Sequence, residues 1–296
     1  MAQAQSAARA NVARLLAVLG LSLSVLAIEI VGGLASHSLA LLADAAHVFT
    51  DAAGISLALL AIWVGTRPAS AQRTFGYLRL EILAAATNAV VLFGVALFIL
   101  YEAWRRLSSP PQVTSTLMLG VALAGLLLNG VALLLLRPIQ ARSLNARAAY
   151  LEVLGDLGGS GAVIVASLVI LAMGWQRADA VASVAIALFI LPRTWGLLRD
   201  ATDVLLEATP KGVSMDEVRA HIREAPGVAD VHDLHAWTIT SGVNVVSAHV
   251  VLESEADGAA VLEFLCDCLS GHFDIDHSTF QLEFPDRRRR EGAAHG

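Results

Sequence analysis

The hydrophobic positions of this chain fall into six long runs, each with the length of a membrane-crossing helix. A helix needs roughly 20 apolar residues to cross the hydrocarbon core of a bilayer. The runs lie at Leu15–Ala35, Leu39–Gly65, Leu80–Ala103, Thr116–Leu136, Ala146–Met173 and Ala178–Leu198. Tryptophans occur near four of the predicted ends, where the indole ring prefers the headgroup region: Trp63, Trp104, Trp175 and Trp195. The pattern therefore predicts six transmembrane helices.

After Asp203 the long apolar runs stop and shorter amphipathic and alternating segments begin. Val228–Thr240 and Val243–Leu252 are typical of a β-hairpin that turns at Ser241 and Gly242. The remaining predicted elements are helices at Met215–Glu224 and Ala259–Leu269 and a strand at Thr279–Phe284. This αββαβ order predicts a small α+β domain. We expect an N-terminal tail at 1–13, a transport domain at 14–203, a regulatory and dimerisation domain at 204–285 and a disordered charged tail at 286–296.

Composition agrees with a membrane location. Hydrophobic residues make up 56% of the chain and charged residues only 16%, against about 25% in soluble domains. The net charge of −6 argues against a nucleic-acid partner, and two cysteines are too few for a disulfide scaffold. Arginines gather at the two ends and in the even-numbered connections, which predicts by the positive-inside rule that both termini are cytoplasmic.

A charged group inside a bilayer is costly, so ionisable residues within the spans are candidate functional residues. They lie on the first, second, third and fifth runs, whereas we interpret the fourth and sixth as nearly free of charge. These residues are Glu29, Asp44, His47, Asp51, Glu81, Glu152 and Asp156. A lone residue of this kind can instead form an interhelical hydrogen bond. We interpret Glu29 and Asp44 as residues with supporting or gating roles.

Two of the ionisable pairs share one spacing. His47 and Asp51 are four residues apart, as are Glu152 and Asp156. On an α-helix this spacing points both side chains in nearly the same direction from neighbouring turns. Two such helices facing each other would offer one imidazole and three carboxylates around a single point. The spacing therefore predicts a four-ligand cage for a divalent cation.

The chemistry of these ligands limits which ions can bind and indicates a mechanism. Nitrogen and oxygen donors without thiolate suit Zn²⁺, Fe²⁺, Co²⁺ or Mn²⁺, and four ligands suit tetrahedral Zn²⁺ best. Three carboxylates left without a cation at low dielectric would have to take up protons. Metal release is then coupled to H⁺ uptake, as a metal/proton antiporter requires.

Four parts of the chain have the form of sequence motifs: Ser38–Asp51 (SLALLADAAHVFTD), Arg73–Tyr77 (RTFGY), Ser143–Arg147 (SLNAR) with Leu154–Asp156 (LGD), and His232–Gly242 (HDLHAWTITSG). Together they resemble the cation diffusion facilitators, above all their bacterial zinc/cobalt/cadmium efflux branch. The similarity runs in order from about Val12 to Glu283.

This resemblance implies a homodimer in the bacterial inner membrane, each subunit with six helices and a cytoplasmic ferredoxin-like domain. It implies that metal moves outward against inward proton flow through His47, Asp51, Asp156 and the position of Glu152. Many zinc transporters of the family have histidine where this chain has Glu152. Because an oxygen-rich site tolerates Mn²⁺ or Fe²⁺ better, an exporter selective for those ions is the alternative.

The resemblance also extends to the soluble domain. His232 and His249 match histidines that bind regulatory Zn²⁺ in relatives, and Glu283 falls where those relatives have a carboxylate. Gln281 replaces a ligand histidine, for which His235 could substitute. A plain surface role is the alternative interpretation of each of these histidines.

Two further expectations follow from the resemblance. Arg79 resembles a basic residue that pairs with an acid after the sixth span, and Glu207 is the candidate partner. The connection that carries a metal site in some relatives has Ser70, Arg73 and Tyr77 at the corresponding positions, so we expect no metal there.

The sequence thus predicts a secondary transporter rather than an enzyme. It exports Zn²⁺, with Co²⁺, Cd²⁺ and Fe²⁺ as further candidates, in exchange for H⁺. A metalloprotease would need an HExxH helix, which the chain lacks. A membrane metal sensor would have a broken ligand pair, and both pairs are intact. Cys266 and Cys268 diverge on a predicted helix in a reducing compartment, so they are expected to be packed or idle thiols.

Overall fold

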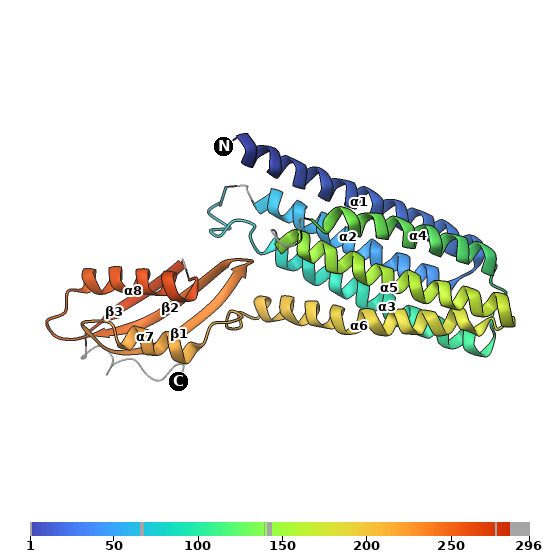
Figure 1. Ribbon diagram of the computed structural model, residues 1–296. Coiled ribbons are helices and arrows are strands. Elements are labelled where there is room, and N and C mark those ends of the chain that lie inside the picture. The colour runs from blue at the N-terminus through green and yellow to red at the C-terminus, as the bar shows by residue number, and fades with distance from the viewer. Residues whose placement is uncertain (1, 66–67, 139, 141–143, 276, 285–296) are drawn as a thin grey trace. The chain divides into compact units, whose positions relative to one another are not determined.

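The computed structural model describes residues 2–65, 68–138, 140, 144–275 and 277–284 (Figure 1). The predicted tail at 286–296 lies outside the described residues. Within α1 and α2 the structure describes the backbone alone for several residues, among them 2–13, 51 and 54–62.

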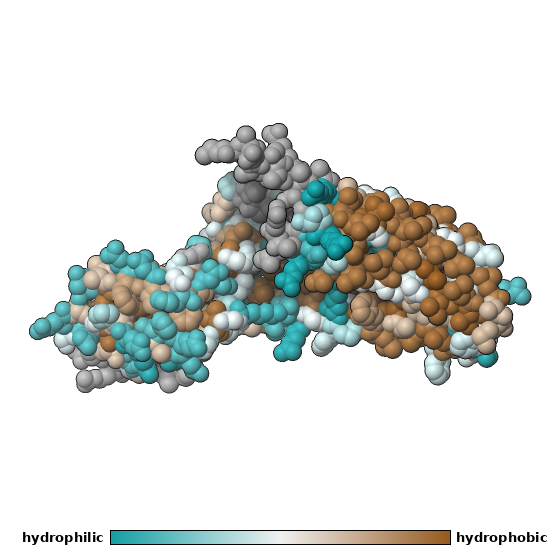
Figure 2. Space-filling model, viewed as in Figure 1, coloured by the Kyte–Doolittle hydropathy of each residue, from teal (hydrophilic) through white to brown (hydrophobic). Residues whose placement is uncertain are grey.

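Six long helices come first in the chain, and the predicted runs differ from them mainly at their ends. They are α1 (Ala2–Ser36), α2 (Leu39–Gly65), α3 (Leu80–Ser108), α4 (Ser115–Leu136), α5 (Leu144–Met173) and α6 (Arg177–Leu205). Within the described residues, five of them have the length and apolar composition of a membrane span. The exception is α2, of which only Leu39–Thr50 enters that comparison. In Figure 2 hydrophobic side chains cover most of the visible surface of these helices.

The helices pack closely where small residues face a neighbour. Helix α4 contacts α1 on one side and α5 on another. On α1, a Cβ atom at Gly32 would collide with the side chain of Val121 on α4, so glycine is what permits this approach. The buried core of the helical part includes Leu41, Met118 and Ile190.

The C-terminal part has the predicted αββαβ order. It comprises α7 (Met215–Arg223), β1 (Val228–Thr240), β2 (Val243–Leu252), α8 (Gly258–Phe273) and β3 (His277–Glu283). The sheet order is β1-β2-β3, with β1 antiparallel and β3 parallel to β2. Helix α8 supplies the crossover that a parallel pair requires.

The two short helices begin where the sequence offers a cap, and they cover one side of the sheet. Ser214 accepts a hydrogen bond from the backbone N–H of Glu217, and Asp257 accepts one from that of Ala259. Helix α7 packs on β1, α8 packs on β3, and the two contact each other. Their apolar faces, with Ile222 and Leu265, close a core over the strands.

The chain divides into two compact units that do not coincide with the helical and mixed parts. One unit contains residues 1–59 and 87–198, and the other contains residues 60–86 and 199–296. Helices α1, α4 and α5 lie wholly in the first unit. Helices α2, α3 and α6 continue from one unit into the other.

Candidate metal centres

Two of the four predicted transport ligands come together in the helical part. His47 on α2 and Asp156 on α5 have side chains that are 5% and 7% exposed, with 3.9 Å between Nε2 and Oδ1. Ligand atoms of one tetrahedral Zn²⁺ lie roughly 3.3 Å apart, given metal–ligand distances of about 2 Å. A small side-chain adjustment would therefore place both atoms on one ion.

The third predicted ligand, Asp51, lies outside the side chains that the structure describes. Its backbone belongs to α2, one turn after His47. Its ligand role stays a prediction from the helical spacing.

The fourth, Glu152, has a partner that the sequence interpretation missed. Glu152 precedes Asp156 by one turn of α5, and its Oε1 accepts a hydrogen bond of 2.9 Å from Nη2 of Arg193. Arg193 lies about midway along α6, a segment interpreted above as nearly free of charge. That interpretation was wrong. The available signal was a charged residue inside a predicted span.

A second group of buried polar residues lies beside this site. Glu29 on α1 and Asp44 on α2 are 1% and 2% exposed, and their carboxyl groups lie near enough to each other to interact. Ser160 on α5 lies 3.4 Å from Asp44 through Oγ and Oδ2. Gly159 makes room for the Asp44 carboxylate, because a Cβ there would overlap it. The carboxyl groups considered for supporting roles thus join α1, α2 and α5.

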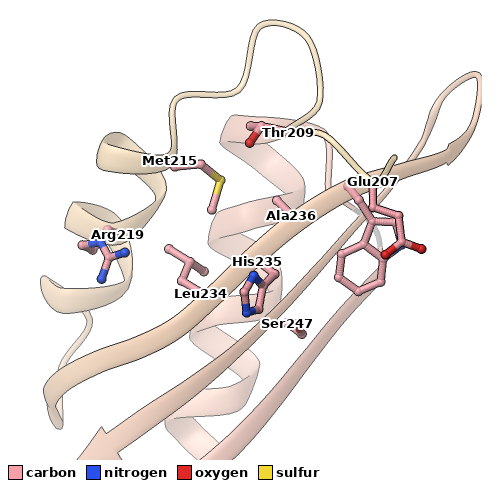
Figure 3. Close-up of a pocket in the computed structure, with 9 residues that line it drawn as sticks. Glu207, Thr209, Met215, Arg219, Leu234, His235, Ala236 and Ser247 are labelled. Carbon is pink, nitrogen blue, oxygen red and sulfur yellow. The ribbon is translucent and has the colours of Figure 1, made fainter. Parts of the chain in front are cut away.

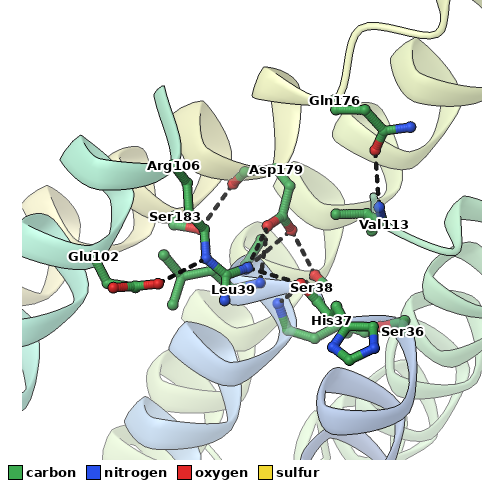
Figure 4. Close-up of polar contacts among 12 residues, drawn as sticks. Ser36, His37, Ser38, Leu39, Glu102, Arg106, Val113, Gln176, Asp179 and Ser183 are labelled. Carbon is green, nitrogen blue, oxygen red and sulfur yellow. Dashed lines mark hydrogen bonds and ion pairs between the residues drawn. The ribbon is translucent and has the colours of Figure 1, made fainter. Parts of the chain in front are cut away.

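The start of α2 is fixed by a carboxylate from another helix (Figure 4). Asp179, in the first turn of α6, accepts hydrogen bonds from the N–H groups of Leu39 and Ala40 and from the Ser38 hydroxyl, the first at 2.8 Å and the last at 2.6 Å. Arg106 on α3 lies 3.6 Å from the same carboxylate. An anion at a helix N-terminus is favourable. This contact therefore fixes where α2 begins and, with it, the position of His47 along the helix.

A second metal-ligating cluster lies on the sheet. His232 on β1 and His249 on β2 are directly opposed in the strand register, with ring centroids 5.1 Å apart. Glu283 on β3 contacts both imidazoles, at 3.2 Å from His232 and 2.9 Å from His249. Ligand atoms of the three all lie within 4.8 Å of one another. Two imidazoles and a carboxylate fit Zn²⁺.

Glu283 remains a carboxylate although it is buried. Burial by itself would raise the pKa of Glu283, but hydrogen bonds from Gln281 and His232 and the charges of His249 and His232 outweigh it and lower the pKa below its ordinary value. Gln281 donates to Glu283 at 2.6 Å. Gln281 therefore orients the carboxylate of this cluster.

His235 lies apart from the three-residue cluster. Its Nε2 is 3.0 Å from Asp233, whose other carboxylate oxygen is 3.8 Å from His249. In Figure 3 the His235 ring lines a pocket that Glu207 and Arg219 also border. Asp233, a residue that the sequence did not indicate, thus connects His235 to the cluster. Asp233 has a φ of 50° beside a register shift between β1 and β2, and such an irregularity is hard to predict.

The predicted Arg79–Glu207 pair is confirmed. Nη2 of Arg79 donates to Oε1 of Glu207 at 2.7 Å, and both residues belong to the same compact unit. In the connection before α3, the Arg73 guanidinium lies 4.6 Å from the centre of the Tyr77 ring.

Comparison with known proteins decides the family. Residues 15–206 match the family described as cation efflux transmembrane domain, and residues 210–284 match that described as cation efflux protein, cytoplasmic domain. This chain belongs to the cation efflux family. The predicted resemblance to the cation diffusion facilitators is thereby confirmed, and the chain is a membrane protein with a helical transmembrane domain and a small C-terminal cytoplasmic domain.

Relatives within the cation efflux family are similar over most of the chain. The metal cation efflux system protein CzcD of Cupriavidus metallidurans is 47% identical over 90% of this chain and 85% of its own length. The zinc transporter ZitB of Escherichia coli is 39% identical over 96% and 93%. The cadmium, cobalt and zinc/H(+)-K(+) antiporter of Bacillus subtilis is 37% identical over 86% and 84%. A function in divalent metal cation efflux, rather than in catalysis, follows for this chain.

Proposed function

We propose that this cation efflux protein exports Zn²⁺ from the cytoplasm in exchange for protons. The convergence of His47 and Asp156 from two helices at 3.9 Å carries the proposal. The names of the relatives support it, since one is a zinc transporter and another a cadmium, cobalt and zinc/H(+)-K(+) antiporter. Co²⁺, Cd²⁺ and Fe²⁺ are further candidate substrates, because nitrogen and oxygen donors accept them too.

In this mechanism the substrate ion binds at the site that contains His47, Asp51, Glu152 and Asp156, with ligands drawn from these four residues. The imidazole is a ligand only when its coordinating nitrogen carries no proton, and carboxylates bind metal only when ionised. Metal and protons therefore compete for the same atoms. When the site opens to the outer side, protons displace the metal, and the protonated site returns inward. The proton gradient thus drives export by alternating access.

The first test is metal uptake into proteoliposomes of purified protein under an imposed pH gradient, with Zn²⁺, Co²⁺, Fe²⁺ and Mn²⁺ compared. We expect Zn²⁺ flux that collapses when an ionophore removes the gradient. Asp156→Asn should lower the flux at least about tenfold, since it removes a charged ligand. Asp203→Asn is the matched control and should retain the flux. Asp203 lies on α6, where it pairs with Arg199 of that helix at 3.9 Å.

The same assay separates the alternatives. Flux of Mn²⁺ or Fe²⁺ without Zn²⁺, moved towards Zn²⁺ by Glu152→His, would identify an exporter selective for harder ions. No flux of any metal would contradict transport and favour a membrane metal sensor.

We further propose a regulatory Zn²⁺ site at His232, His249 and Glu283. The buried carboxylate between two opposed imidazoles supports it. Full-length protein carrying His232→Ala and His249→Ala together should bind one Zn²⁺ fewer per chain than the parent in equilibrium dialysis. His235→Ala should bind as many as the parent, because His235 lies outside the cluster. Equal stoichiometry in all three proteins would overturn this site.

The assembly and orientation belong to the same proposal. We infer a homodimer in the bacterial inner membrane, a transport domain at 14–203, a regulatory domain at 204–285 and both termini in the cytoplasm. The arginine distribution supports the orientation.

Two measurements test these points. Cys266, exposed on α8, should react with a membrane-impermeant maleimide in inside-out vesicles and not in intact spheroplasts. Light scattering of the detergent-purified protein should give the mass of two chains.

A further inference from the structure

Arg193 places a permanent positive charge about midway along a membrane-spanning helix. Arginine does not lose its proton in proteins, so the charge cannot be avoided by titration. Arg193 lies five residues before the predicted end of the span at Leu198, and a charge within a span is costly unless it is paired, faces a polar cavity or reaches the interface. Its position is therefore expected to have a function.

The partner of this charge belongs to the proposed transport site. The 2.9 Å separation between Nη2 of Arg193 and Oε1 of Glu152 is typical of a charge-assisted hydrogen bond. The Glu152 side chain is 24% exposed and that of Arg193 55%. Both charges act electrostatically on His47 as well. The guanidinium thus lies at the rim of the site.

The Arg193–Glu152 pair changes the net charge of the proposed transport site. Asp51, Glu152 and Asp156 contribute three negative charges when ionised, one more than a divalent cation neutralises. The Arg193 guanidinium cancels one of them. With Arg193 in place the site has a net charge of minus two, which matches the substrate ion.

We propose that Arg193 determines metal selectivity by holding Glu152 away from the transported ion. The proposal rests on the transport function proposed above. While the ion pair is closed, the protein ligands are one imidazole, from His47, and two carboxylates. Without Arg193, Glu152 is released and becomes a third carboxylate ligand, which makes the site richer in oxygen, more negative and better suited to a hard ion such as Mn²⁺.

The test is a double-mutant cycle on full-length protein in proteoliposomes, with initial rates of Zn²⁺ and Mn²⁺ uptake measured for each variant. The variants are Arg193→Gln, Glu152→Gln, the two combined, and Arg193→Lys. Arg199→Gln is the matched control, since Arg199 lies further along α6 and pairs within it. The ratio of Mn²⁺ to Zn²⁺ rates is independent of how much protein is folded.

We expect Arg193→Gln to raise the Mn²⁺/Zn²⁺ ratio at least about fivefold, the effect of a coupling near 1 kcal/mol. Glu152→Gln leaves Arg193 as an uncompensated cation beside the site, so Zn²⁺ uptake should fall at least about tenfold, and adding Arg193→Gln should restore most of it. Arg193→Lys and Arg199→Gln should keep the parental ratio within about twofold, because the charge beside Glu152 persists in both.

Two outcomes would overturn the inference alone: an unchanged ratio in Arg193→Gln, or strictly additive losses in the double variant, when the parent transports Zn²⁺. A parent that transports no metal would instead overturn the proposed function, and the inference with it.

Discussion

At the scale of single residues, the helical part depends on how little space surrounds its buried carboxylates. Asp44 reaches the backbone of α5 only because Gly159 has no side chain there. The same carboxylate accepts a hydrogen bond from the Ser160 hydroxyl, and the Glu29 carboxyl group lies near it. Polar groups so enclosed are costly to displace, because each loses partners that water cannot replace.

Gly159→Ala should therefore destabilise the protein by about 1–3 kcal/mol, the usual cost of overpacking. The added methyl group would push the Asp44 carboxylate away from Ser160 and Glu29. Gly161→Ala, two residues further along α5, is the control: no atom lies within 4 Å of the added Cβ, so the better helix propensity of alanine should stabilise the protein by about 0.5–1 kcal/mol. Thermal unfolding in detergent measures both, and equal midpoints for the two variants would contradict the steric argument.

Glu283 makes the stability of the soluble domain depend on pH. Its pKa in the folded protein lies below the ordinary value of 4.5, so the carboxylate stabilises the fold above that pH, and this contribution is lost as the pH falls through the lowered folded value. Glu283→Gln should be less stable than the parent at pH 7, and the difference should shrink as the pH falls below 4.5.

Calorimetry of the full-length protein in EDTA, from pH 7 downwards, measures this difference without bound metal. A gap between parent and Glu283→Gln that stays constant with pH would show that ionisation of Glu283 does not contribute.

At the scale of elements, hydropathy and alternation predict most of the fold. The bounds of α2, β1 and β2 agree with the prediction, because each is flanked by residues that end it, such as the turn at Ser241 and Gly242. The end of α6 was predicted seven residues early (205 − 198), because charged residues follow Leu198 and hydropathy reports where a span leaves the bilayer rather than where its helix ends.

The candidate sites, too, could be predicted from the sequence in part. Spacing along one helix predicted that His47 and Asp51 share a face, whereas the pairing of His232 with His249 depends on register shifts between β1 and β2 that the hairpin pattern does not predict. The pairing of Glu152 with Arg193 depends on how α5 and α6 are rotated about their axes, which no spacing within one helix specifies. The role of Asp233 depends on a left-handed residue in a strand, which the sequence does not mark.

The start of α2 gives a prediction at this scale. Asp179→Ala removes the acceptor of the Leu39 and Ala40 N–H groups and of the Ser38 hydroxyl, all buried, and should cost about 1–3 kcal/mol. Asp179→Asn can still accept one of these bonds and should lose less. Thermal unfolding of the three proteins, with transport rates beside it, checks this order, and an alanine variant as stable as the parent would contradict it.

At the scale of the whole molecule, the beginning of α3 belongs with the C-terminal domain. Glu81, in the first turn of α3, accepts hydrogen bonds from the hydroxyl groups of Thr240 and Ser241, the latter at 2.8 Å. The Arg79–Glu207 pair lies in the same unit. An exposed ion pair contributes little to stability, so the contacts of Glu81 are the stronger connection.

Thr240→Val combined with Ser241→Ala should therefore loosen the beginning of α3. Amide hydrogen exchange of peptides covering 80–86 should become faster, whereas that of peptides from α4, which lies wholly in the other unit, should not change. Thr238→Val is the control, since Thr238 bonds Asn244 instead. Faster exchange in α4 as well would indicate a general loss of stability.

Three helices are shared between the two units, and α5 is not among them. Arg193 lies on α6, which continues past Leu198 into the second unit, whereas Glu152 lies on α5, which belongs entirely to the first. A substitution that breaks this ion pair therefore removes a contact between a helix that the two units share and a helix that they do not share.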